Sequence, residues 1–357
     1  MASRDLAATR REFLGARGLG ALAAALGLDL GGDIEAPACG ELLVVCRAAM
    51  ACRFEILLPD SSLAAAAGEA LALVDDLEQQ LSVFKPDSEL SAINRSACER
   101  PVEVEHGLFA LLETCARLWA ETSGSFDAAQ GALSALWRCC RKEGRAPRPE
   151  EIEAAVSQGG MQHVILDPPR KTVAFTRPGV ALNLGAIGKG YAVDRICHHL
   201  RAGGVRNALA HAGHSSIFAM GGPAPGQPWL VSVENPQSPD EPIAKIALRD
   251  QAMATSAATH QAYEVDGHRY GHIIDPRIGR PAGWRADKVL SATAIASTAT
   301  EADALSTAFH IMGLEQAAAY CERNPGVGAL IVRRDEESGN LQVTNFGIPP
   351  GALEVLV

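Results

Sequence analysis

The sequence has 357 residues, of which 47% are hydrophobic and 21% charged, and its formal net charge at pH 7 is −10. This composition predicts a core-forming protein of one large domain or two intimate ones, and it excludes disordered, collagenous and coiled-coil classes. A charge this negative also argues against binding to nucleic acid, which needs a basic patch. The nine cysteines form no CxxC pair and no zinc-type spacing with histidine, so we expect free, mostly buried thiols.

The first residues are typical of a twin-arginine export signal. Arg10 and Arg11 are followed by a short, weakly apolar run rich in Ala and Gly. That run is too short to span a bilayer, which needs about 20 apolar residues, but it suits a secretory leader. Residues 1–38 are therefore predicted to be an export signal with a short linker, which implies a periplasmic or cell-envelope protein. The alternative is an ordinary amphipathic N-terminal helix. Residues 39–357 are predicted to form a single catalytic domain.

Hydrophobic periodicity predicts both helices and strands along this domain. Apolar residues at three- and four-residue spacing predict helices at 63–81, 106–121, 189–202 and 302–322. Short β-branched or apolar runs predict strands at 41–46, 163–166, 172–175, 206–211, 229–234, 289–296, 328–333 and 341–345. Short polar turns between strands favour hairpins over parallel crossovers. The predicted class is α+β, with mixed or largely antiparallel sheets flanked by helices.

The densest chemical signal is the glycine-rich segment from Leu182 to Asp194. Glycines at 185, 188 and 190 allow a backbone to approach a ligand closely, and Lys189 stands at the start of a predicted helix. Helix-start amides together with a lysine can hold a phosphate group. The segment is not a Walker A loop, because Gly190 rather than Ser or Thr follows the lysine. A simple strand-to-helix turn is the alternative.

A second cluster surrounds His272. Asp275-Pro276 and the following Gly279 mark a tight turn, which would hold His272 on a fixed backbone. Asp275 and Arg277 are close enough in sequence to tune a general base. Lone histidines are more often structural or solvent-exposed, and this chain has ten.

The third cluster is the start of the last predicted helix. Asp303 and Thr307 lie four residues apart, so their oxygens share a helix face and could bind a hard cation such as Mg²⁺. The alternative is a capping arrangement, with Thr298 or Thr300 as N-cap and Asp303 near the positive end of the helix dipole. The residues alone leave both interpretations open.

Taken together and in this order, the clusters resemble the ApbE-type FAD:protein FMN transferase family. Five motifs carry the resemblance: Gly185–Asp194, Ala212–Ser216, Ala254–Ser256, His272–Gly279 and Asp303–Thr307, with weaker likeness at Leu81–Leu90 and Gly124–Asp127. The resemblance implies an ApbE/T-fold-like flavin transferase architecture. It also implies a magnesium-dependent transfer of the FMN moiety of FAD to a Thr or Ser hydroxyl of an acceptor flavoprotein, with release of AMP.

The resemblance further implies roles for individual residues. Magnesium would be held by the Asp303 carboxylate, the Thr307 hydroxyl and the backbone carbonyls of Ala186 and Ser306. Lys189 would neutralise the FAD phosphates, and His272 would deprotonate the acceptor hydroxyl, so that His272, Asp303 and Lys189 are the expected catalytic residues. The residues expected to bind FAD are Phe84, Ser125, Phe126, Asp127, Asn183, Lys189, His272 and Ile273.

Some residues depart from the family pattern, and two other functions remain open. Asn183 stands where the family commonly has Asp, and His214 replaces the second glycine of a pair. The same residues would also suit a magnesium-dependent FAD pyrophosphatase or a non-catalytic exported FAD-binding protein. No nucleic-acid partner is expected, and any membrane association would run through the acceptor or a lipidated Cys39.

Overall fold

The computed structural model describes residues 42–257, 263–265, 267–282, 289–335 and 338–357. The predicted export signal and Cys39 lie outside these residues. Within the described part of the chain, no helix combines the length and the apolar character needed to cross a membrane.

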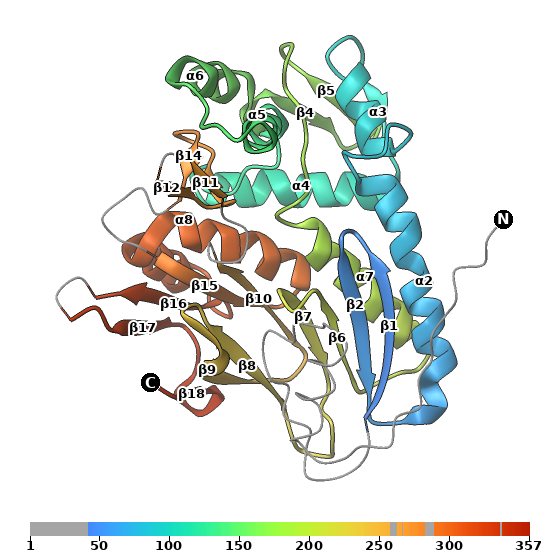
Figure 1. The fold of residues 1–357 in the computed structure, drawn as a ribbon. Helices are drawn as coiled ribbons and strands as arrows, with labels where there is room; N and C mark the ends of the chain where they lie inside the picture. The colour runs from blue at the N-terminus through green and yellow to red at the C-terminus, as the bar shows by residue number, and fades with distance from the viewer. Residues whose placement is uncertain (1–41, 258–262, 266, 283–288, 336–337) are drawn as a thin grey trace.

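One antiparallel sheet of eight strands forms the centre of the protein (Figure 1), in the order β1-β2-β6-β7-β10-β15-β16-β17. Its strands are β1 (Leu43–Ala49), β2 (Cys52–Leu58), β6 (Ala208–Ala212), β7 (Ser216–Met220), β10 (Gln251–Ala257), β15 (Val289–Ala296), β16 (Gly328–Arg334) and β17 (Leu341–Phe346). Every neighbouring pair in it is antiparallel. The predicted α+β class with antiparallel pairing is confirmed.

Three helices cover one face of this sheet: α2 (Ala64–Leu81), α7 (Gly188–Ala202) and α8 (Ala299–Arg323). The strand residues that face α8 are small. On β10 they are Ala252 and Ala254, and the larger residues between them point to the other face of the sheet. Ala292, Ala294 and Ala296 of β15 do the same. Small side chains allow α8 to lie close to the sheet, and α4 (His106–Glu121) lies beside α8.

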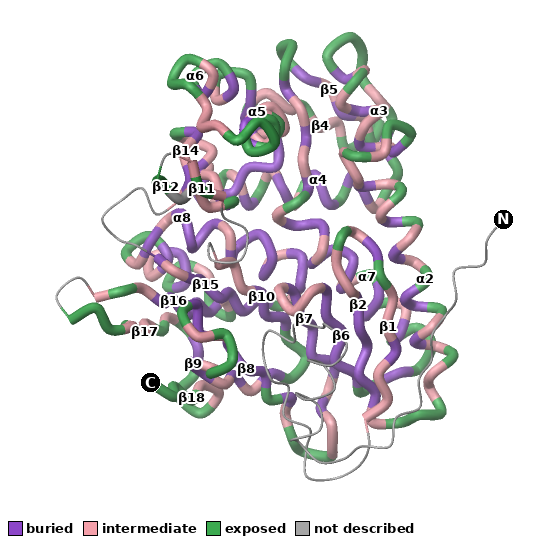
Figure 2. Tube along the Cα trace, in the orientation of Figure 1, coloured by how far each residue is buried: buried purple, intermediate pink, exposed green. Residues whose placement is uncertain are grey.

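The opposite face of the large sheet packs on a smaller sheet in a second core. This sheet has the order β18-β9-β8 and consists of β8 (Trp229–Asn235), β9 (Ser238–Leu248) and β18 (Leu353–Val355). Trp229 is its largest fully buried side chain, and Leu57, Ile217 and Met253 meet it from the large sheet. Figure 2 shows that buried segments concentrate along the large sheet and the inner side of α8.

A third group of elements lies on the far side of α4 and α8 (Figure 1). It contains the helices α3 (Glu89–Ser96), α5 (Gly131–Glu143) and α6 (Pro149–Gln158), and a sheet of β3 (Val102–Glu103), β5 (Thr172–Phe175) and β4 (Val164–Asp167). Two hairpins, β11 (Tyr263–Val265) with β12 (His268–Tyr270) and β13 (Ile274–Asp275) with β14 (Arg280–Pro281), stand beside them. Trp137 of α5 packs against Tyr263 and Tyr270 and so ties the first hairpin to this group.

The predicted helices are confirmed within three residues at each end, and the predicted strands correspond to β1, β4, β5, β6, β8, β15, β16 and β17. Helices α3, α5 and α6, strands β2, β7, β9 and β10, and the short strands β3, β11, β12, β13, β14 and β18 are absent from the predicted ranges. All eight described cysteines are free, and Cys115, Cys140, Cys197 and Cys321 are buried.

Candidate active site

Asp303 is the point at which three of the sequence motifs meet. Asp303 on α8 is 5% exposed, and its carboxylate accepts hydrogen bonds from two other elements. The backbone N–H of Gly190 in α7 donates to Oδ2 at 3.0 Å, and the Ser216 hydroxyl at the start of β7 donates to Oδ1 at 2.9 Å. The Nζ of Lys189 lies 3.7 Å from Oδ1. A buried carboxylate is thus held by a glycine-rich helix start, a strand start and a lysine.

Gly190 permits this arrangement because it has no side chain. A Cβ at this position would lie 2.0 Å from the carbonyl oxygen of Ala299 and 2.8 Å from the Cβ of Asp303. Real Cβ atoms do not approach other atoms so closely, so α7 and α8 could not meet at their present distance. The glycine at position 190 is therefore required for the packing of α7 against α8, whether or not the motif binds a ligand.

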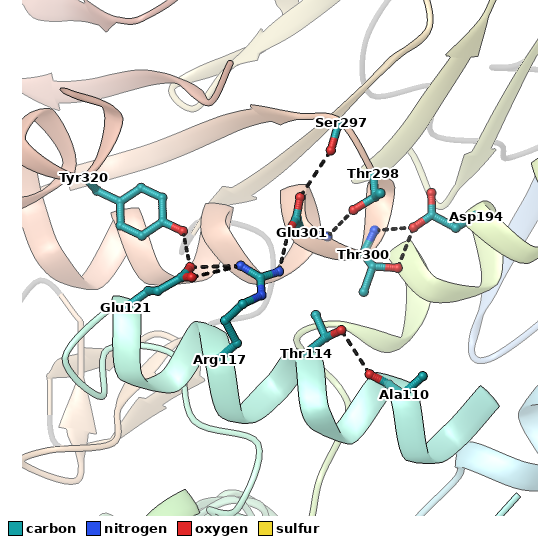
Figure 3. A network of polar contacts seen from close by, with 10 residues as sticks. All are labelled: Ala110, Thr114, Arg117, Glu121, Asp194, Ser297, Thr298, Thr300, Glu301 and Tyr320. Carbon is teal, nitrogen blue, oxygen red and sulfur yellow. Dashed lines mark hydrogen bonds and ion pairs between the residues drawn. The ribbon is translucent and has the colours of Figure 1, made fainter. Parts of the chain in front are cut away.

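The N-terminus of α8 is capped by two residues (Figure 3). Thr298 is the N-cap and accepts a hydrogen bond from the Glu301 N–H at 3.2 Å, as one of the sequence alternatives proposed. Asp194 of α7 accepts from the N–H groups of Ala299 and Thr300, both at 2.8 Å. These contacts satisfy three of the four unpaired donors of the first turn. Asp303 is not part of this cap, because its oxygens bond to Gly190 and Ser216 instead.

A second set of contacts joins α8 to α4. Arg117 of α4 forms ion pairs with Glu121 on its own helix and with Glu301 of α8. The hydroxyl of Tyr320, near the end of α8, donates to Glu121 at 2.9 Å. α8 is interrupted by a kink at Gly313, where φ is 75°, and these contacts tie α4 to α8 on both sides of that kink.

Hydroxyl groups extend the Asp303 cluster along α8. Ser256, at the end of β10, lies on the same strand face as Ala254 and points toward α8. Its hydroxyl lies 2.9 Å from that of Ser306 and 3.2 Å from that of Thr307. The Ser306 hydroxyl also donates to the Asp303 carbonyl at 2.9 Å. Carboxylate, hydroxyl and carbonyl oxygens are thus concentrated within about one turn of the helix.

These oxygens fit a hard cation. Magnesium in proteins is bound by one or two carboxylates, with water and substrate phosphates completing the octahedron. Within the described residues, no group of three or more His, Cys, Asp or Glu could form a metal site of another kind. Asp303, Thr307 and the carbonyl of Ser306 supply oxygens on α8, and Ala186 lies in the turn that precedes α7.

Cys52 stands near the Lys189–Asp303 pair at the start of β2. Burial raises the pKa of its thiol to about 11, although Lys189 opposes this increase. The thiol is therefore neutral near pH 7, a state that disfavours nucleophilic attack by Cys52.

The predicted turn after His272 forms and is docked on α5. Arg277 donates to the Asp275 carboxylate from Nε at 2.9 Å and from Nη2 at 2.8 Å, and the Gly279 N–H donates to the Asp275 carbonyl at 2.8 Å. The indole N–H of Trp137 donates to the Gly279 carbonyl at 2.9 Å. Gly279 has a φ of 69°, which disfavours a side chain. His272 itself is exposed, whereas Ile273 is buried.

His272 lies beside α8. Burial lowers the pKa of His310, a residue of α8, to about 4, and the nearby His272 lowers it further. The residue predicted as a base and the helix that carries Asp303 are therefore neighbours in the structure, although His272 and Asp303 are 31 positions apart in the sequence.

The predicted flavin-binding residues differ in their environments. Phe84 is 72% exposed, with the Arg138 guanidinium 4.9 Å above its ring, which makes it suitable for stacking on a planar ligand. The side chain of Phe126 is buried in the main core, and the Ser125 hydroxyl is buried without a hydrogen-bond partner in the described structure. The predicted roles of both in FAD binding stay predictions.

Asp127 and Asn183 stabilise local turns. The Asp127 carboxylate accepts from the N–H groups of Ala129 at 2.7 Å and Met161 at 3.3 Å, and burial raises its pKa to about 6. The Asn183 Oδ1 accepts from the Gly185 N–H at 2.9 Å. Asn183 thus shapes the glycine-rich turn with its amide oxygen, a role that needs no negative charge.

His214 adopts a left-handed backbone conformation, with a φ of 60°, where glycine is usual in the family. Its ring stacks on that of His211 at 5.0 Å between centroids. The Nε2 of His211 lies 3.3 Å from a carboxylate oxygen of Glu55, its partner across β2 and β6. His211 shares its sheet face with Leu209, opposite the helices, so the ring of His214 lies against the face that does not carry Asp303.

Sequence reasoning gave no role to Ser216, Ser256 or Asp194, although each lies inside a recognised motif. The signal available for them was a polar residue at a strand end or inside a helix, next to a glycine-rich or small-residue segment. Such a residue is common on any surface, and only the pairing of strands and helices shows that these three surround Asp303 and the start of α8.

Comparisons with known proteins agree with this geometry. The ApbE family model matches residues 50–331. The chain is 33% identical to the FAD:protein FMN transferase of Treponema pallidum (strain Nichols) over 292 residues, which are 78% of this chain and 80% of the relative. It is 31% identical to the protein of the same name from Vibrio cholerae serotype O1, over 74% of this chain and 78% of that one.

Solved structures show the same likeness. The crystal structure of the ApbE protein from Thermotoga maritima matches with a TM-score of 0.75 and 30% identity, over 85% of this chain and 96% of that one. The flavin transferase ApbE from Vibrio cholerae matches with a TM-score of 0.72 and 26% identity, over 86% and 98%. Because the family model covers most of the sequence and the fold agrees along almost the whole length of these structures, the chain belongs to the ApbE family.

Proposed function

We propose that the chain is a transferase that moves the FMN moiety of FAD to a Thr or Ser hydroxyl of an acceptor flavoprotein, with Mg²⁺ bound and AMP released. The observation that carries this proposal is the Asp303 cluster. Lys189 and Ser216 contact one buried carboxylate, and about one turn further along α8 the Ser256 hydroxyl contacts Thr307. It occurs in a chain similar to proteins named FAD:protein FMN transferase.

The reaction forms a bond between the acceptor oxygen and the FMN phosphorus and breaks the bond from that phosphorus to AMP. Asp303, Thr307 and the carbonyls of Ala186 and Ser306 would hold Mg²⁺, which would neutralise charge on the pyrophosphate oxygens. Lys189 and the amides at the start of α7 would bind the same phosphates. His272 would take the proton of the attacking hydroxyl.

Location and partners belong to the same proposal. Residues 1–38 would direct the protein across the cytoplasmic membrane by the twin-arginine route, so its acceptor would be a flavoprotein subunit of the periplasm or cell envelope. Because its net charge is −10, the protein as a whole repels an anionic dinucleotide such as FAD. Groups at the site therefore have to attract the phosphates. Lys189, the helix-start amides and the metal would supply that attraction.

The test is to mix the purified protein, lacking residues 1–38, with FAD, Mg²⁺ and a flavoprotein subunit that carries the acceptor hydroxyl. We expect flavin fluorescence that survives denaturation of the subunit, one AMP for each flavin attached, and loss of both signals with EDTA. An acceptor variant with Ala in place of the acceptor Thr or Ser is the control. AMP and free FMN without attached flavin would show a pyrophosphatase, and FAD binding without AMP would show a binding protein, so either result refutes the proposal.

A further inference from the structure

The turn between β1 and β2 has an unfavourable backbone conformation. Ala49 pairs with Cys52, so Met50 and Ala51 form the turn, and their φ angles are 50° and 58°. Two-residue turns of this kind normally contain Asn and Gly, because other side chains are strained at positive φ. Such strain persists only where surrounding contacts hold it, and it often marks a functional segment.

The turn packs against the start of α7. A Cβ on Gly188, the first residue of that helix, would lie 3.5 Å from the Cε of Met50. Met50 therefore contacts the residue that precedes Lys189, whose Nζ lies 3.7 Å from the Asp303 carboxylate. If the turn relaxed, the Met50 side chain would leave the helix start at which the FAD phosphates are proposed to bind.

Glu78 of α2 binds this turn with one oxygen and a second segment with the other. Its Oε1 accepts a hydrogen bond from the Met50 N–H at 2.9 Å, and its Oε2 accepts from the Nζ of Lys85 at 3.1 Å. Lys85 directly follows Phe84, the exposed aromatic residue that is predicted to stack on FAD. One half-buried carboxylate therefore joins the strained turn to the segment that carries Phe84.

We propose that Glu78 is a positioning residue for FAD binding, which keeps the Met50–Ala51 turn against the start of α7 and links it to the Phe84 segment before FAD arrives. This inference rests on the proposed function. Without the Glu78 carboxylate the two left-handed residues can relax, so fewer molecules have a turn that is ready to bind. The apparent Kd rises by the inverse of that fraction, and a fall to about one tenth makes it about 10-fold larger. Saturating FAD restores the bound geometry, so the transfer rate should then change little.

Three measurements on variants of Glu78 test this inference: the Kd of FAD, the single-turnover rate of FMN transfer at saturating FAD, and the melting temperature. We expect Glu78→Ala to raise the Kd by about 10-fold with a nearly unchanged rate. In Glu78→Gln the amide oxygen can accept from the Met50 N–H, so most of the affinity should return. Adding Ala51→Gly to Glu78→Ala should also restore affinity, because glycine adopts a positive φ without strain.

The matched control is Asp75→Ala. Asp75 lies three residues before Glu78 on α2 and accepts from the Nε of Arg47 on β1 at 2.9 Å. This variant therefore breaks another link between α2 and the same hairpin, but away from the turn. It should leave the Kd of FAD unchanged, whatever its effect on the melting temperature.

The outcomes separate this inference from the proposed function. A wild-type Kd in a folded Glu78→Ala variant, or equal increases in Glu78→Ala and Asp75→Ala, would overturn it. Amide hydrogen exchange of Met50 in the wild-type protein needs no variant. Protection before FAD is added supports a turn that is already held, and exchange as fast as in an unstructured chain would overturn the inference. If the wild-type protein binds FAD but transfers no FMN, the proposed function fails, while a Kd that depends on Glu78 would still support the positioning role.

Discussion

Asp194 on α7 caps the helix that carries Asp303, because its carboxylate accepts from the Thr300 N–H (Figure 3) and from the Ala299 N–H, each at 2.8 Å. The Thr300 hydroxyl donates to the same carboxylate. Burial raises the pKa of Asp194, and these three hydrogen-bond donors oppose that increase. The position of Asp303 therefore depends on a residue of another helix, 109 positions away in the sequence.

The first prediction concerns this cap. Asp194→Ala leaves two helix-start N–H groups and one hydroxyl without their acceptor, so we expect the free energy of unfolding to fall by about 1–3 kcal/mol. The transfer rate should fall with it, because the first turns of α8 become less ordered. Denaturant unfolding and single-turnover transfer measure the two effects. Asp60→Ala, which removes an exposed aspartate cap from Ser61–Leu63, is the control and should leave transfer unchanged. Equal behaviour of the two variants would contradict the prediction.

The second prediction compares the two charged residues of the candidate site. Asp303→Asn keeps the shape and one acceptor oxygen but removes the charge, so the Gly190 and Ser216 contacts can be partly retained. We expect it to abolish transfer more completely than Lys189→Ala, since magnesium has no other carboxylate in this set of ligands. Transfer is measured over a range of Mg²⁺ concentrations. A larger defect in Lys189→Ala would remove magnesium from the centre of the proposal.

The third prediction tests the contact between α7 and α8. The Cβ of Gly190→Ala would be forced against the Ala299 carbonyl at 2.0 Å, so we expect a loss of about 3 kcal/mol or more and loss of transfer. Gly203→Ala, at the other end of α7, is the matched control because its Cβ would find ordinary contacts at 3.5 Å. Thermal unfolding of the two variants gives the comparison. A Gly190→Ala protein as stable as Gly203→Ala would show that the helices can separate at little cost.

The fourth prediction concerns Phe84, which is too exposed to stabilise the core. Phe84→Ala should leave the melting temperature unchanged and weaken FAD binding by about 10-fold or more, the usual effect of losing one stacked aromatic ring. Quenching of flavin fluorescence on titration with protein measures the Kd. Leu230→Ala removes another exposed apolar side chain, 43% exposed, from β8 in the small sheet on the other face of the large sheet, and it should not affect binding. An unchanged Kd in Phe84→Ala would exclude stacking.

The fifth prediction is a pH dependence that arises from Asp127. Its pKa is raised by burial from 3.8 to about 6, so the folded protein holds this proton more tightly than the unfolded chain does. The free energy of unfolding should therefore decrease as pH rises from about 4 to about 6. Each unit of difference between the folded and unfolded pKa corresponds to about 1.4 kcal/mol, so the total decrease should be about 3 kcal/mol. Asp127→Asn cannot ionise and should lack this decrease. Urea unfolding of both proteins across the range gives the difference, and parallel curves would contradict it.

Some parts of this fold were accessible from the sequence. The helices α2, α4, α7 and α8 were predicted because each has an apolar stripe at three- and four-residue spacing, which is a local property. Strand β10 was missed because its residues are small, with Ala at 252 and 254, and small residues give weak alternation. Helix α5 was missed although Leu133, Trp137 and Cys140 have helical spacing, because these three residues are its only buried positions; its place in the fold is set by packing on α6 and on the β11–β12 hairpin.

The sequence by itself determined the class, the principal helices and the motifs that contain Lys189, His272 and Asp303, because short-range patterns record backbone preference and the chemistry of neighbouring residues. The tertiary structure alone decided that Ser216 and Gly190 meet Asp303, that Ser256 meets Ser306 and Thr307, and that Asp194 of α7 joins Thr298 in capping α8. Those contacts join strands and helices that are far apart in the chain. Their geometry follows from the pairing order of the large sheet and the close packing of α7 on α8, which no local pattern encodes.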